Sequence, residues 1–284
     1  MAGILSGLKS LGLENLENRD IFAEEEHAST VSAANEPVIK SENKVRESEL
    51  IYSKEMICPV CDRKFVTMIM KSGRVRLLGT DDDLKPKYDG IESQKYDVIL
   101  CENCGYAALS KNFSKILSSQ AKLIKENICA GVKMKKYDGD FYSFEQAEER
   151  YKLALACAVV KKAKSSEKAL ICLKSAWVFR AHRENLTVNG ENIDYIESLQ
   201  AHENEYLENA YRGFLNAREK EDFPIAGMEP STLDYLLARL AYRFGEYDTS
   251  AKLVSSILIS ANNDRIKNKA RDLKEELLAL KKPR

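Results

Sequence analysis

The chain reads Cys58-Pro59-Val60-Cys61 and, after residues 62–100, Cys101-Glu102-Asn103-Cys104-Gly105-Tyr106. A two-residue spacer lets both sulfurs of a pair turn toward one metal ion, while N–H groups of the tight turn point at them. Gly105 can adopt the positive φ that often closes such a turn. The two pairs therefore predict one tetrahedral site with four ligands: Cys58, Cys61, Cys101 and Cys104.

The ion predicted for this site is one structural Zn²⁺ per chain. Four cysteines fill a tetrahedral shell, whereas a catalytic zinc keeps one position open for water. Two alternatives remain open from the residues alone: redox chemistry at a single C-x-x-C pair, and free thiols with no common role. Structural disulfides are disfavoured because the sequence shows no secretion signal.

Composition narrows the class of protein. The 284 residues include 44 basic and 44 acidic side chains, so the formal net charge is zero. This balance argues against a general polyanion binder but leaves room for a local basic patch. Glycine and proline are sparse, which favours helix. No apolar run is long enough to cross a bilayer, and the cysteines fit a reducing compartment, so we expect a cytoplasmic protein.

Residues 51–110 are predicted to form a small β module of the zinc-ribbon type. Two strand-like runs, 64–70 and 74–78, are joined through Ser72-Gly73, which favours a hairpin. A third run, 96–100, leads into the second cysteine pair. Such a module has little core of its own, so a bound metal would contribute on the order of 10 kcal/mol to its folding. The acidic run at 81–83 fits no calcium loop and is interpreted as a turn.

Residues 111–284 carry the apolar spacing of helices and are expected to form antiparallel hairpins. The predicted helices cover residues 111–136, 144–162, 193–219, 233–244 and 264–282, with a further one beginning at Ser165 or Ser166. Residues 236–247 resemble one tetratricopeptide unit, which places Gly-x-Tyr at the turn between its helices. A generic helical bundle is the alternative. The remaining cysteines are predicted core residues: Cys129, Cys157 and Cys172.

Two segments precede the β module. Residues 1–20 hold Ile4 and several leucines on a shared helical face, which predicts a short amphipathic helix that docks back on the protein or frays. Association with a membrane surface is the alternative for this helix. Residues 21–50 are acidic and small-polar, with too little apolar surface for a core, and are predicted to be a flexible linker. The fold class expected for the whole chain is α+β and mostly helical.

A cluster of basic side chains in the first predicted hairpin suggests a competing function. Phosphate contacts need such residues, which are Arg63, Lys64, Lys71, Arg74 and Arg76. However, residues 58–104 hold eight basic and eight acidic side chains, and four thiolates with Zn²⁺ would add negative charge. A solvated charged face is therefore favoured over a nucleic-acid site.

Three segments carry a family resemblance. They read C-P-V-C-D-R-K-F at 58–65, G-R-V-R-L-L-G-T-D-D-D-L-K-P-K-Y-D-G-I at 73–91, and K-Y-D-V-I-L-C-E-N-C-G-Y-A-A-L at 95–109. Together they resemble the bacterial family catalogued as domain of unknown function 2225, from Tyr52 through most of the helical region. The resemblance implies a bacterial, cytoplasmic protein with paired cysteines and a repeat-like helical part. It implies no activity.

The sequence predicts a non-enzymatic protein, because it contains no phosphate-cradling Gly-rich loop, H-E-x-x-H motif or nucleophile elbow. In this interpretation the zinc module anchors helices that present a surface to another protein. The alternatives are a nucleic-acid-binding regulator that uses the basic hairpin, and a thiol-redox protein. No catalytic or cofactor-binding residue is assigned, and the oligomeric state is not predicted.

Overall fold

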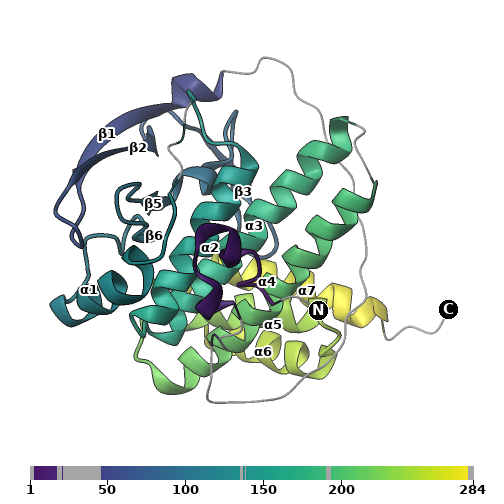
Figure 1. Ribbon diagram of the computed structural model, residues 1–284. Helices are drawn as coiled ribbons and strands as arrows, with labels where there is room; N and C mark the ends of the chain where they lie inside the picture. The colour runs from purple at the N-terminus through teal and green to yellow at the C-terminus, as the bar shows by residue number, and fades with distance from the viewer. Residues whose placement is uncertain are drawn as a thin grey trace.

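Figure 1 shows the computed structural model of the protein, which describes residues 3–17, 21, 46–134, 137, 139–189 and 193–280. Seven α-helices and three two-stranded sheets make up the regular structure of these residues. The β1–β2 and β5–β6 sheets lie on one side of the molecule, whereas β3 lies close to the long helices. As predicted, the fold is α+β and mostly helical.

The strands pair with near neighbours in the chain. All three sheets are antiparallel: β1 (Ile51–Ile57) with β2 (Lys64–Met70), β3 (Leu77–Thr80) with β4 (Pro86–Tyr88), and β5 (Val98–Leu100) with β6 (Ala107–Leu109). Residues 58–63 connect the first pair of strands and residues 101–106 connect the third. Each cysteine pair is therefore also the loop of a hairpin.

The predicted hairpin between residues 64–70 and 74–78 is wrong. β2 forms at the predicted residues, but its partner is β1, and residues beyond 76 enter β3, which pairs with β4. The physical reason lies in the first cysteine turn. The Cys58 N–H donates to the Arg63 carbonyl over 3.0 Å, which sets Ile57 opposite Lys64 and aligns β1 with β2.

From residue 144 onward, the helices follow the predicted boundaries closely. Its helices are α1 (Ser118–Ile124), α2 (Phe144–Val160), α3 (Ser165–Asn189), α4 (Ile193–Lys220), α5 (Pro230–Arg243), α6 (Tyr247–Ser260) and α7 (Asp264–Leu280). The predicted helix over 111–136 forms only from Ser118, and a π-helical turn continues it to Cys129. Ser143 caps α2 as expected, since its hydroxyl accepts the Gln146 N–H and the Gln146 side chain accepts the Ser143 N–H.

One hydrophobic cluster runs from the cysteine turns into the helices. Arg150 of α2, only 1% exposed, crosses between the two parts. Its guanidinium donates to the Val98 carbonyl and the Thr67 hydroxyl, and it lies 4.0 Å from the centre of the Tyr142 ring. These contacts dock β2 and β5 on α2. The segment boundaries predicted at residues 50 and 110 remain a prediction.

Residues 3–17, dark purple in Figure 1, lie against the helices. They form two short 3-10 helices, Leu8–Leu11 and Glu14–Leu16, and not the predicted amphipathic helix. Gly7 and Gly12 have φ values of 84° and 79°, which a continuous right-handed helix does not contain. Of the predicted linker over residues 21–50, only residues 21 and 46–50 are among those described.

Candidate metal centre

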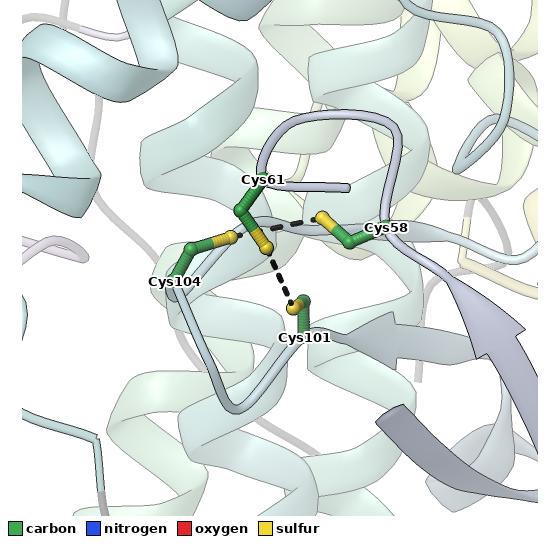
Figure 2. A group of neighbouring side chains, drawn as sticks. All are labelled: Cys58, Cys61, Cys101 and Cys104. Atoms are coloured by element: carbon green, nitrogen blue, oxygen red, sulfur yellow. Dashed lines mark hydrogen bonds between the residues drawn. The ribbon is translucent and has the colours of Figure 1, made fainter. Parts of the chain in front are cut away.

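The four predicted cysteines come together in one cluster. Their sulfurs all lie within 4.8 Å of one another, and Cys58–Cys104 and Cys61–Cys101 are each separated by 3.7 Å between Sγ atoms. Figure 2 shows the side chains converging on a common centre from two facing turns. Cys58, Cys101 and Cys104 are buried, and Cys61 is partly buried.

The two turns repeat the same backbone pattern. In the first, the Cys58 N–H donates to the Arg63 carbonyl and the Asp62 N–H to the Cys58 carbonyl. In the second, Cys101 donates to Tyr106, and Gly105 donates to Cys101. The fifth residue of each turn has a positive φ, 59° at Asp62 and 75° at Gly105. The expectation for Gly105 is confirmed. Asp62 adopts the same left-handed conformation although it has a side chain, which makes this conformation less favourable than for glycine.

Backbone donors also reach the sulfurs. The Val60 N–H lies 3.4 Å from the Cys58 Sγ, as expected for a tight turn that holds a thiolate. Such donors stabilise negative charge on sulfur and fix its direction. The local sequence thus builds both the position of the thiols and part of their electrostatic environment.

The sulfurs cannot all be charged without a cation. Hydrogen bonds from Cys104 and then Cys58 lower the pKa of Cys101 to about 2, whereas the hydrogen bond with Cys101 is the main cause that raises the pKa of Cys58 to about 12. The pKa of Cys104 is also raised, chiefly by its hydrogen bond with Cys101. One thiolate is therefore stabilised by its protonated neighbours. A cation at the centre would replace those protons and compensate the remaining charges.

The residues fit a metal ion and not a disulfide. An S–S bond is about 2.05 Å long, far shorter than the distances between these sulfurs. Four thiolates at tetrahedral spacing suit soft, tetrahedral metals. The structure therefore supports metal binding by this cluster, with Cys58, Cys61, Cys101 and Cys104 as the predicted ligands.

A fifth cysteine lies beside the cluster. Cys129, predicted as a core residue, is only partly buried, and its hydrogen bond with Cys104 lowers its pKa. Cys157 and Cys172 are fully buried, as predicted. Val132, three residues after Cys129, packs so closely on Gly105 that a Cβ atom added to Gly105 would lie 2.6 Å from Val132 Cγ1. Residues 129–132 therefore form one wall of the second cysteine turn.

The basic side chains of the alternative nucleic-acid site lie toward opposite ends of β2. Lys64 pairs with Glu55 at 2.8 Å, and the Lys71 ammonium donates to the Glu49 carbonyl. Lys64 begins β2 and Lys71 directly follows it, so their backbones are separated by about 20 Å at the usual rise of a strand. Arg63, Arg74 and Arg76 are exposed. The hairpin that would have gathered them does not form.

Sequence reasoning missed a buried ionic cluster. Asp83, interpreted as part of a turn, is only 7% exposed and contacts Arg180 and Trp177 of α3. Arg180 also pairs with Glu203 of α4, which is fully buried and receives further contacts from Arg183 and Arg243. The run of three aspartates was the available signal, but nothing in the sequence identified its distant partners.

Among the described residues, no helix combines the length and apolarity that crossing a bilayer requires. No curated protein and no solved structure matches this chain significantly. One family profile does match, over residues 51–277, which begins at β1 and ends within α7. Because this match covers well over half of the chain, the protein belongs to the bacterial family described as "Uncharacterized protein conserved in bacteria (DUF2225)".

Proposed function

We propose that the protein is a non-enzymatic interaction protein in which one structural Zn²⁺ closes a zinc-ribbon-like module and the helices present a surface to another protein. The observation that carries the proposal is the spacing of the four sulfurs. A Zn–S distance of about 2.3 Å requires tetrahedral S–S edges of about 3.8 Å. Two of the observed separations are 3.7 Å.

The chemistry assigned to this zinc is structural. Four thiolates leave no position for water or substrate, so the ion acts through the folding free energy that it supplies. It would do so where two hairpins meet without strand pairing, because β1–β2 and β5–β6 are separate sheets. The ion would tie the two hairpins together and anchor both against α2.

The interaction role is supported by the helical architecture. α5 and α6 form a hairpin that turns at Gly245, whose φ of 78° is the conformation that glycine permits in a tetratricopeptide-like turn. α7 packs against both helices and extends the stack. Stacked helix hairpins offer extended surfaces that bind protein segments.

Metal analysis of the purified chain tests the first half of the proposal. Elemental analysis after gel filtration in a reducing buffer should find about one zinc per chain and distinguish it from iron, the other metal that favours four thiolates. A redox protein would instead yield metal-free chain with a cycling pair of thiols.

Cross-linking tests the second half. The chain is recovered at its natural level from its own bacterium after cross-linking, with and without nuclease. We expect a protein partner whose cross-links map to α2–α7 and whose binding is saturable with purified components. Recovery that depends on nucleic acid, with contacts at Arg74 and Arg76, would contradict the proposal and favour the nucleic-acid regulator.

A further inference from the structure

The N-terminal segment, residues 3–17, packs on the helices through apolar side chains, and we call the surface that it covers the groove. The six large aliphatic side chains of the segment are all 6% exposed or less: Ile4, Leu5, Leu8, Leu11, Leu13 and Leu16. They belong to the same hydrophobic cluster as α2, α3 and α4. The segment contributes no strand and no α-helix to the fold. Its attachment therefore depends on side chains inserted into a surface that other residues build.

The walls of the groove bind the backbone of the segment. The Tyr206 hydroxyl of α4 donates to the Ile4 carbonyl over 3.0 Å, and the Lys133 N–H donates to the Leu11 carbonyl over 3.0 Å. The Lys168 ammonium of α3 donates to the Ile21 carbonyl over 2.6 Å. Contacts to main-chain carbonyls do not depend on which side chains the bound segment carries. They are the kind of contact by which a groove holds the backbone of a bound peptide.

The segment also has a shape of its own. Glu17 accepts hydrogen bonds from the N–H groups of Gly7 and Lys9, each over 2.9 Å, which closes the segment on itself. Gly12 bends the chain, and a Cβ at this position would lie 2.2 Å from the Gly131 carbonyl oxygen. The groove thus selects a pattern, Leu8-x-x-Leu11-Gly12-Leu13-x-x-Leu16, in which leucines flank an obligatory glycine.

The family profile matches the residues that build the groove but not the segment that occupies it. Tyr206, Lys133 and Lys168 all lie within residues 51–277, the part of the chain that the family profile matches. Residues 3–17 lie outside it. The walls therefore belong to the common part of the fold, and the occupant belongs to the flanking part of this chain.

We propose that this groove is a docking site for a leucine-rich segment of another protein with the pattern L-x-x-L-G-L-x-x-L, and that residues 3–17 are its built-in competitor. This inference rests on the proposed interaction function and names the partner class. Because residues 22–45 tie the competitor covalently to the rest of the chain, an outside segment of equal intrinsic affinity must reach on the order of millimolar concentration to displace it. Release of the N-terminal segment would therefore control access to the groove.

The test uses the full chain with a specific protease site inserted among residues 22–45, and a fluorescein-labelled peptide of residues 3–21 as probe. Before cleavage the groove is occupied intramolecularly, and the probe should bind at least about tenfold more weakly than after cleavage. After cleavage the original segment should exchange, and the probe should bind saturably.

Matched peptides test the pattern. Leu8→Asp and Gly12→Ala probes should fail to bind, the first because Leu8 is fully buried and the second because of the Gly131 carbonyl. A Lys9→Gln probe should bind like the original, since Lys9 is exposed. Equal binding of the Gly12→Ala probe would overturn the assigned pattern.

Three results would overturn the proposal itself. The cleaved chain could retain its segment without exchange, or it could lose the segment and unfold by circular dichroism; either makes residues 3–17 part of the core. The uncleaved chain could also form dimers that disappear on cleavage, which would make a second copy the occupant. This experiment uses only purified components, so its failure counts against the docking site alone. Failure to find a cellular partner by cross-linking would instead count against the interaction function.

Discussion

Replacing Asp83 by Asn tests the buried ionic contact between the β3–β4 hairpin and α3. Asp83 Oδ2 lies 2.5 Å from the Arg180 guanidinium and 3.0 Å from the Trp177 indole nitrogen. The Asp83 side chain is 9% exposed and that of Arg180 is 13% exposed. The substitution keeps the shape of the side chain but removes its charge, and so leaves one arginine of a buried cluster partly uncompensated.

The expected loss is about 3 kcal/mol of unfolding free energy. Removing one partner of a buried ion pair typically costs roughly 3–5 kcal/mol. The lower end applies here because Arg180 keeps its 2.9 Å contact with Glu203 and the asparagine can still accept the Trp177 N–H. The adjacent Asp82 is a matched control. Its side chain is 66% exposed and pairs with Arg239, so Asp82→Asn should cost less than about 1 kcal/mol.

Urea unfolding at pH 7 with zinc present measures both variants. The midpoint should fall for Asp83→Asn at an unchanged slope, and amide exchange should quicken at Leu84, whose N–H donates to the Asp81 carbonyl within the turn. If Asp83→Asn loses no more stability than Asp82→Asn, the buried cluster does not fasten the hairpin and the reasoning fails.

Three further predictions concern acid stability, the second cysteine turn and metal content. Burial raises the pKa of Asp83, but Arg180 and then Trp177 outweigh this effect and hold the pKa below its usual value. The charged form of Asp83 therefore stabilises the folded state above the unfolded-state pKa of about 4. This contribution is lost as the pH falls through the lower pKa of the folded state. The deficit of Asp83→Asn should shrink in urea titrations below pH 4, and a deficit independent of pH would contradict the assignment. Gly105→Ala should lower the free energy of unfolding by about 2 kcal/mol or more in thermal or urea unfolding, because Gly105 has a φ of 75° and contacts Val132. Gly73→Ala is the control and should leave stability unchanged, because the space around Gly73 is open. Cys61→Ser should lose tightly held metal by elemental analysis while Cys172→Ala retains it, and equal metal content in both variants would remove Cys61 from the site.

The cysteine turns could be predicted because their chemistry and geometry are local. A C-x-x-C spacing fixes where two sulfurs point, and Gly105 signals the turn that follows. The partner of β2 could not be predicted in the same way. Residues 51–57 carry no strong alternation, and their pairing depends on the Cys58 turn acting as the hairpin loop.

Long-range polar pairing was beyond sequence reasoning. Asp83 and Arg180 are 97 residues apart, and either residue alone has the features of an ordinary surface charge. Burial of Glu203 among arginines follows only from how α3, α4 and α5 pack. By contrast, the glycines of the N-terminal segment did carry a readable signal. Gly7 and Gly12 interrupt the leucine spacing, and their left-handed conformations end the predicted helix.

X-ray absorption at the zinc edge of the full chain, purified under reducing conditions, tests the central claim most directly. We expect one zinc per chain with a first shell of four sulfurs at about 2.3 Å and no lighter ligand. A shell containing nitrogen or oxygen, or a chain that holds no metal after gel filtration, would contradict the closed four-cysteine site.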